Sequence, residues 1–295
     1  MSQLFAEIHV TLFGYLPTPF LLGRYRIVNT AFRNIVNHFI DSMKTIPRTA
    51  DVSDGCHVAV LRAFCSIPGQ TVTLAPGIYD IEADDWNYAH RREPPCAGYP
   101  KADESFAVIC LAGGLTLIGH DDAIFDTNEE WSEHRGKTTL DVYGGHVRME
   151  NVTMREKTRF QIRQGSVTAI GCTFSQVLIF SGQVKMEHCR ITCKRGSGIN
   201  LYADDCDLTL TNCIVEECGD CGIHVDNHAV ATLVHCKIRG NKKAGLSTSN
   251  NGSVEIIGGS CSDALTEKNG NIIANGCECL GNWLNVDGTG DIKYM

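Results

Sequence analysis

The sequence repeats one short pattern of apolar residues six times between residues 147 and 261. In each copy, apolar residues stand two positions apart. A cysteine, valine or glycine follows three positions after the second apolar residue. The copy ends two positions further on with another apolar residue or a cysteine. The copies start at Val147, Val167, Val184, Leu208, Ala231 and Val254, so successive starts lie 20, 17, 24, 23 and 23 residues apart. A repeat of this length indicates stacked units that each bury an apolar face against their neighbours.

The spacing within each copy predicts two short strands with a bend between them, because apolar residues two positions apart mark a strand with one buried face. The bend residues are Asn, Gly and His, which adopt left-handed backbone geometry most readily: Asn151, Gly171, His188, Asn212, His235 and Gly258. A third strand closes three of the repeats, at 199–203, 223–225 and 246–248. Three strands per repeat predict a mainly β fold, a right-handed parallel β-helix of about eight to nine coils.

Cysteine is unusually frequent, with 15 residues in the chain, and four of them occupy one position of the repeat. We expect this column to fill the inside of the bend, since a free cysteine packs as a small apolar residue: Cys172, Cys189, Cys213 and Cys236. Cys218 and Cys221 form a lone C-x-x-C outside the column. A structural role, a metal site and a redox pair all stay open there, but no partner motif lies at zinc-finger spacing. We expect no metal and no cofactor.

The charge and hydropathy of the chain restrict its partners and its compartment. A formal net charge of -8 argues against a nucleic-acid-binding protein, which must neutralise phosphates. No apolar run is long enough to span a membrane, and the N-terminus does not look like a secretion signal. Cysteines in such a chain are expected to be reduced, which predicts a cytoplasmic or nuclear location, or both.

Residues 55–295 are expected to form the β-helix domain, with a linker at 41–54. The segment 58–65 predicts a short capping helix, and the residues up to 81 predict a strand, a Pro-Gly turn and a second strand; the next coil follows at 107–126. This arrangement resembles the opening of pectin-lyase-like β-helix proteins, and the resemblance covers roughly residues 55–280 as a pattern. The intervening loop at 82–105 carries Trp86, Tyr88 and Tyr99, and a long loop on a solenoid is usually either disordered or functional.

Residues 1–40 do not fit the repeat and predict a small helical segment broken at Pro17. Leu4, Ile8, Leu12 and Leu16 stand four positions apart and would form one apolar stripe on a helix. A segment this short cannot bury its own core. It must therefore pack against the solenoid or against another protein.

The order of residues in this segment resembles an F-box. Leu4, Glu7, Ile8, Leu12, Phe13, Tyr15, Leu16 and Pro17 match the first half of that motif without a gap, and Phe20, Leu21, Arg26, Val28, Asn29, Phe32 and Arg33 match the second. Phe5 stands where proline is usual, and Asn29 where cysteine is more common. F-box proteins with a C-terminal β-helix of the carbohydrate-binding-and-sugar-hydrolase repeat type form a known group, which this chain resembles.

The F-box resemblance implies a non-catalytic, substrate-recognition adaptor of an SCF-type cullin-RING ubiquitin ligase. The F-box would dock on the Skp-family linker subunit, and through it on a cullin, while the β-helix holds an unknown protein target near the ligase. The residues that the resemblance assigns to linker binding are Leu4, Ile8, Leu12, Phe13, Leu16, Pro17, Val28 and Phe32.

Two other functions stay open. The chain could be a plain β-helix binding or scaffold module whose helical segment only caps the solenoid. It could also be a carbohydrate-active enzyme, with candidate acids and a candidate base at Asp204, Asp205, Asp207, Asp226 and His224, although these do not form an intact catalytic motif. Two surfaces could bind a target: the aromatic loop with Trp86, Tyr88 and Tyr99, and the basic turns with Lys194, Arg195, Lys242 and Lys243.

Overall fold

The computed structural model describes residues 49–52, 69–80, 107–111, 113–120, 123–126, 138–155, 158–286 and 289–295. Within these ranges the chain forms 29 short strands, β1 to β29, that pair in parallel into three sheets. The F-box-like segment, the expected capping helix at 58–65 and the loop at 82–105 lie outside them. No helix within the described residues is long and apolar enough to cross a membrane.

Sheet A is the largest, with 11 strands. Its strands, in spatial order, are β1 (Thr49–Val52), β2 (Thr71–Leu74), β5 (Thr116–Gly119), β8 (His146–Glu150), β11 (Ser166–Ile170), β14 (Gly182–Glu187), β17 (Cys206–Thr211), β20 (Val230–Val234), β23 (Ser253–Ile257), β26 (Asn271–Asn275) and β29 (Asp291–Tyr294).

Sheets B and C have nine strands each. Sheet B consists of β3 (Gly77–Asp80), β6 (Ala123–Asp126), β9 (Thr153–Met154), β12 (Thr173–Phe174), β15 (Arg190–Ile191), β18 (Ile214–Glu216), β21 (Lys237–Arg239), β24 (Ser260–Cys261) and β27 (Glu278–Cys279). Sheet C consists of β4 (Ala107–Leu111), β7 (Thr138–Val142), β10 (Phe160–Ile162), β13 (Val177–Ile179), β16 (Ile199–Leu201), β19 (Cys221–Val225), β22 (Ala244–Thr248), β25 (Ala264–Thr266) and β28 (Trp283–Asn285).

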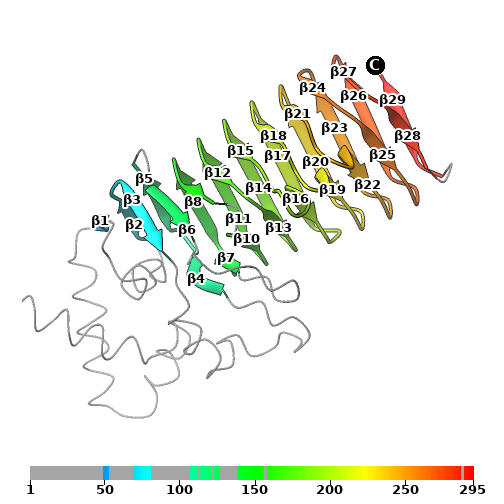
Figure 1. Cartoon of the computed structure of the whole chain (residues 1–295). Coiled ribbons are helices and arrows are strands. Elements are labelled where there is room, and N and C mark those ends of the chain that lie inside the picture. Colours follow the sequence, from blue (N-terminus) through cyan, green and yellow to red (C-terminus); the bar gives the residue numbers. More distant parts are fainter. Residues whose placement is uncertain are drawn as a thin grey trace, which may run out of the picture.

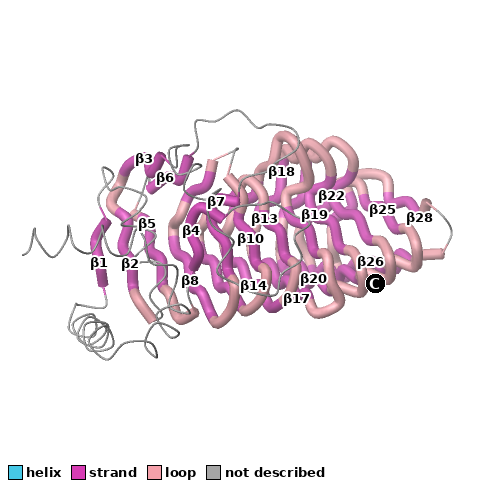
Figure 2. The backbone as a smooth tube through the Cα atoms, turned by 90° about the horizontal axis from the view of Figure 1, so that it is seen from below, coloured by secondary structure: helices cyan, strands magenta, loops and turns pink. Residues whose placement is uncertain are grey.

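The chain visits sheets A, B and C in turn, so three consecutive strands make one coil of a solenoid. Nine coils run from β2–β3–β4 to β26–β27–β28, and β1 and β29 extend sheet A at its two ends. Figure 1 shows the strands stacked along one axis, and Figure 2 shows the same stack from below, with the described turns in pink between the strands. The predicted β-helix and its number of coils are confirmed.

Every bend predicted between the first two strands of a repeat has left-handed geometry. The φ angles are 53° at Asn151, 54° at His188, 53° at Asn212 and 53° at His235, and they are 62° at both glycines of the column. The amide of each bend residue donates to a carbonyl of the next coil, as from Asn212 to Val234 over 2.9 Å. Asn, His and Gly recur there because other side chains would be strained in this geometry.

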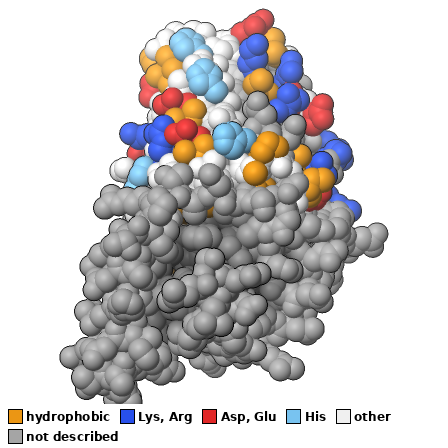
Figure 3. Space-filling view, turned by 90° about the vertical axis from the view of Figure 1, so that its left-hand side faces the viewer, with side chains coloured by type: hydrophobic (Ala, Val, Ile, Leu, Met, Phe, Trp, Pro, Cys, Tyr) orange, Lys and Arg blue, Asp and Glu red, His pale blue; other side chains and the backbone are white. Residues whose placement is uncertain are grey.

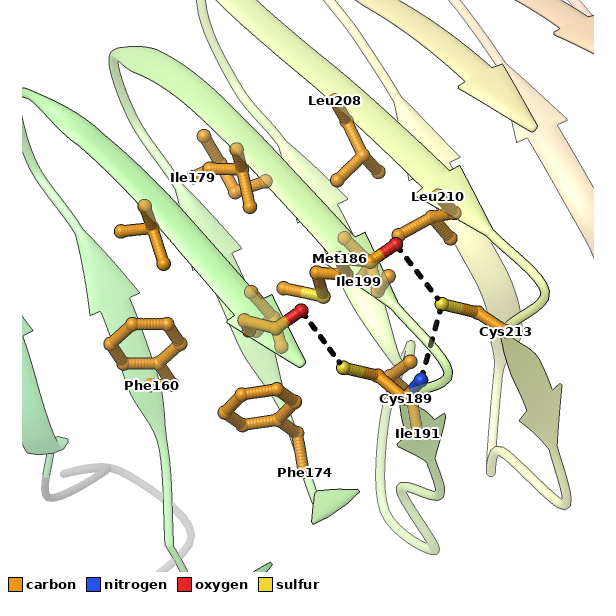
Figure 4. Close-up of a cluster of buried hydrophobic side chains, with 14 of the residues drawn as sticks. Phe160, Phe174, Ile179, Met186, Cys189, Ile191, Ile199, Leu208, Leu210 and Cys213 are labelled. Carbon is orange, nitrogen blue, oxygen red and sulfur yellow. Dashed lines mark hydrogen bonds between the residues drawn. The ribbon is translucent and has the colours of Figure 1, made fainter. Parts of the chain in front are cut away.

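The predicted cysteine column lies inside the solenoid. Cys172, Cys189, Cys213 and Cys236 are all buried, and their neighbours are the leucine, isoleucine, methionine and phenylalanine side chains of the three inner sheet faces. Figure 4 shows how Cys189 and Cys213 point into this core beside Leu210 and Ile191. The eleven cysteines with described side chains are all free thiols.

Candidate binding face on sheet C

One row of side chains on the outer face of sheet C is polar over most of the solenoid. In β16 the side chains of Ile199 and Leu201 point inward and are fully buried, so the side chain of Asn200 points outward. The strand register places Asn200 beside His224 on β19, and His224 beside Ser247 on β22. Between β7 and β25 the row reads Asp141, Gln161, Leu178, Asn200, His224, Ser247 and Leu265. Its polar members other than His224 are buried, and Leu178, His224 and Leu265 are half-buried.

An aromatic and cationic row follows the ends of the same strands. The guanidinium carbon of Arg163 lies 5.7 Å from the ring centroid of Tyr143 and 5.8 Å from that of Phe180. The rings of Phe180 and Tyr202 are stacked, with their centroids 5.1 Å apart. Such contacts stabilise a fixed arrangement of large side chains at the surface. Four successive coils therefore present a continuous ladder beside the polar row.

A buried ion pair connects the two rows. Arg163 Nε donates to Asp141 Oδ2 over 3.0 Å, and the Asp141 side chain is fully buried. Burial raises the pKa of the Asp141 carboxyl above its ordinary value, while the neighbouring Arg163 acts in the opposite direction. Asp141 thus orients Arg163 between its aromatic neighbours at this end of the face.

His224 is the half-buried titratable group of the row, and its two neighbours, Asn200 and Ser247, are buried. Burial lowers the imidazole pKa of His224. Asp226, Asp220 and Glu267 oppose this shift, whereas the ammonium of Lys243 reinforces it. These charges lie on the turns on both sides of sheet C, so His224 lies between them. Because the pKa of its imidazole is below the ordinary value, His224 is neutral at neutral pH.

The acidic residues that sequence considerations single out do not gather at one point. Asp204, Asp205 and Asp207 are exposed, on the turn from sheet C to sheet A and the first residues of β17. Ser181 donates its hydroxyl to Asp205 Oδ2 over 2.5 Å. Only Asp226 comes near His224, two residues further along the chain.

The Asp226 carboxylate is occupied by turn hydrogen bonds. Its Oδ1 accepts from Ser249 Oγ over 2.8 Å and from Asn250 Nδ2 over 2.6 Å. Asn227 and Asn250 both have left-handed backbone, with φ of 52° and 47°. These contacts fix the turns after β19 and β22 on each other.

The basic turns form a mixed-charge face. Lys194, Arg195, Lys242 and Lys243 are exposed on turns from sheet B to sheet C. The intervening coil contributes Asp220, whose Oδ1 lies 3.9 Å from Lys243 Nζ. Figure 3 shows lysine and arginine side chains along the right-hand edge of the molecule with acidic side chains beside them. The other candidate target-binding residues, Trp86, Tyr88 and Tyr99, lie outside the described residues, as do all the proposed linker-binding residues.

The C-x-x-C motif belongs to the wall of the solenoid. Cys218 is fully buried and Cys221 is 2% exposed. Burial raises the pKa of the Cys218 thiol to about 12 and that of Cys221 to about 11, so both thiols are protonated. Among the described residues, no group of three or more His, Cys, Asp and Glu side chains could hold a metal ion.

The polar row on sheet C escaped the sequence analysis, although a signal for it is present. Five of the third strands, β7, β10, β16, β19 and β22, have a polar residue between two inward-facing residues, as in Ile199-Asn200-Leu201 and Ile223-His224-Val225. The apolar positions alone are enough to predict the strands. Reading the residue between them, coil after coil, would have shown the row.

Comparison with known proteins places the fold. No curated protein matches the sequence of the chain. A solved structure, the Azotobacter vinelandii mannuronan C-5 epimerase AlgE4 A-module, is similar with a TM-score of 0.46 and 15% identity, over 83% of this chain and 94% of that chain. The family described as a right handed beta helix region matches residues 110–261, more than half of the sequence, and the chain belongs to this family.

Proposed function

We propose that the β-helix is a non-catalytic binding module that holds its target against the part of sheet C around His224. We call this surface the His224 face, and it comprises Tyr202, His224, Asp226, Asp220 and Lys243. The observation that supports the proposal is the register of sheet C, which aligns a polar row with an aromatic ladder along the solenoid. Charges on the turns at both margins would fix the orientation of a bound ligand.

The hydrogen bonds of the carboxylates favour binding over catalysis. General acid–base chemistry needs two groups with separated pKa values that face one substrate. Asp226 accepts hydrogen bonds from Ser249 and Asn250, and Asp205 accepts one from Ser181. Both carboxylates therefore stabilise turns of the solenoid through hydrogen bonds. His224 is then a neutral hydrogen-bonding group without an acidic partner for acid–base catalysis.

Arrays of immobilised peptides and oligosaccharides, probed with the full chain, would test this function. We expect a retained ligand whose affinity falls at least about tenfold in His224→Ala and in Tyr202→Ala, as for residues at the centre of an interface. His235→Asn is the matched control, because His235 is exposed on the bend between sheets A and B and asparagine tolerates its left-handed backbone. Ligand binding that ignores His224→Ala would refute the assigned face. A covalently changed ligand, produced only when His224 is present, would show that the chain is an enzyme.

The order of residues in segment 4–36 favours a second, more specific role. We propose that this segment docks on a Skp-family linker subunit and a cullin, so that the β-helix acts as the target-recognition part of a ubiquitin ligase. The apolar residues at F-box positions support this role, since interface energy concentrates in a few large apolar anchors. Direct binding of the purified linker subunit to the full chain is the test.

A further inference from the structure

The last coil of the solenoid exposes large apolar side chains beside open sheet edges. Strands β27, β28 and β29 each end a sheet, so among the described residues one side of each strand has no strand paired to it. Five apolar residues of this coil are more than half exposed: Leu280, Leu284, Val286, Tyr294 and Met295. An apolar surface of this kind marks an interaction site, and an open strand edge is a template for another strand.

Aromatic side chains close the core at this end but remain accessible. The register places Trp283 on Ala264 and Tyr294 on Ala274, so each large ring covers a small residue of the coil beneath. The two ring centroids are 5.2 Å apart. Tyr294 is still 59% exposed, which shows that a single aromatic layer separates the core from solvent.

The backbone of β29 fixes which residues can pair outward. Asp291 N donates to Gly270 O over 2.9 Å, and Met295 N donates to Ala274 O over 2.8 Å. The amide and carbonyl of one residue in a strand point to the same side, and successive residues alternate. Asp291, Lys293 and Met295 therefore direct their backbone groups toward β26. Those of Ile292 and Tyr294 face the open edge.

We propose that this edge pairs with a second copy of the chain, in an antiparallel arrangement with the two-fold axis at Ile292. The two Ile292 residues would then exchange both of their backbone hydrogen bonds, which requires the outward-facing groups that Ile292 has. Asp291 of each copy would lie opposite Lys293 of the other, in the closely spaced type of pair. The interface is isologous, as in most homodimers.

Charge selects this register among the possible ones. The side chains of Asp291 and Lys293 are exposed on the outer face of sheet A, and Lys293 Nζ lies 2.7 Å from Asp291 Oδ2 within one chain. Pairing centred on Ile292 gives two opposite-charge cross-strand pairs. Pairing centred on Tyr294 would place Lys293 opposite Met295 and would form neither of these opposite-charge pairs. The sequence Asp-Ile-Lys is thus complementary to itself.

Sedimentation velocity of the full chain over a range of concentrations tests the proposal. We expect a monomer–dimer equilibrium that Lys293→Asp and Asp291→Lys each weaken at least about tenfold, because each variant alone would set like charges opposite each other. An equimolar mixture of the two variants should recover the dimer, and so should the double variant that exchanges the two residues. Lys185→Asp, in the same outer row of sheet A but several coils away, should leave the equilibrium unchanged.

Three results would overturn the proposal. The first is a chain that stays monomeric at all concentrations. The second is a dimer that both single variants leave intact. The third is a mixture of correctly folded single variants that does not associate. Circular dichroism melts of all variants distinguish a lost interface from a lost fold, and the double variant retains both side chains in exchanged positions.

Discussion

Cys213 donates its thiol hydrogen to the carbonyl oxygen of Met186 on the preceding coil, with Sγ and O 3.4 Å apart. Figure 4 shows this contact and the one from Cys189 N to Cys213 Sγ, also 3.4 Å. Cys236 repeats the pattern with Leu210, over 3.5 Å. The column thus combines the packing of a small apolar side chain with weak hydrogen bonds between coils.

A charge placed in this column should destabilise the fold severely. We expect Cys213→Asp to lower the free energy of unfolding by about 3 to 5 kcal/mol, because it buries an unpaired carboxylate. Thr209→Asp is the control, since Thr209 lies on the outer face of the adjoining strand β17. Its effect should stay within about 0.5 kcal/mol. Chemical denaturation of both variants decides, and equal losses would contradict the inward position of Cys213.

The bend at Asn212 should reject β-branched side chains. Its φ angle of 53° is left-handed, which asparagine and glycine tolerate and valine does not. We expect Asn212→Val to cost about 1 to 2 kcal/mol and Asn212→Gly to be nearly neutral. Thermal melts of the two variants provide the comparison. A valine variant as stable as the glycine variant would show that the bend relaxes.

The repeating part of the fold was accessible from sequence because the same side-chain pattern is imposed on coil after coil. The bends at His188 and Asn212 and the third strand that begins at Ile199 all occur where the pattern predicts them. Parallel stacking makes each coil a copy of the last, so any local signal is repeated and reinforced. Single-site features have no such reinforcement.

The position of Cys218 and the polar row illustrate what the pattern does not specify. Cys218 lies outside the column, on the turn from sheet B to sheet C, and its side chain is nevertheless fully buried. Cys218→Ser should therefore destabilise the fold, because a buried hydroxyl requires a hydrogen-bond partner. The contact between Arg163 and Asp141 joins residues 22 positions apart and depends on the coil length, which varies between repeats.

The stability of the chain should depend on pH through Asp141. Burial raises the pKa of this carboxyl above its ordinary value of 3.8. At pH values between the pKa of the unfolded state and that of the folded state, the folded chain therefore binds more protons than the unfolded chain. The stabilisation by Asp141 is fully present at pH values below its pKa in the unfolded state, and it is lost as the pH rises through its pKa in the folded state.

Asp141→Asn isolates this effect, because the variant has no carboxyl to titrate at that position. The free energy of unfolding of the wild type relative to the variant should fall as pH rises above 3.8. Urea denaturation at a series of pH values measures the difference. A relative stability that rises with pH would mean that Arg163 outweighs burial and that the Asp141 pKa is lowered instead.

The F-box resemblance predicts that the full chain binds a Skp-family linker subunit through residues 4–36. Replacing Leu16 and Pro17 together with alanine should remove most of this binding, because interface energy concentrates in a few large apolar anchors. The melt of the β-helix should stay the same if the segment is separate from the core of stacked coils. Asn37→Ala, just beyond the segment, is the matched control and should bind normally. A full chain that ignores the linker subunit at micromolar concentration would exclude the adaptor role and leave the His224 face as the functional surface.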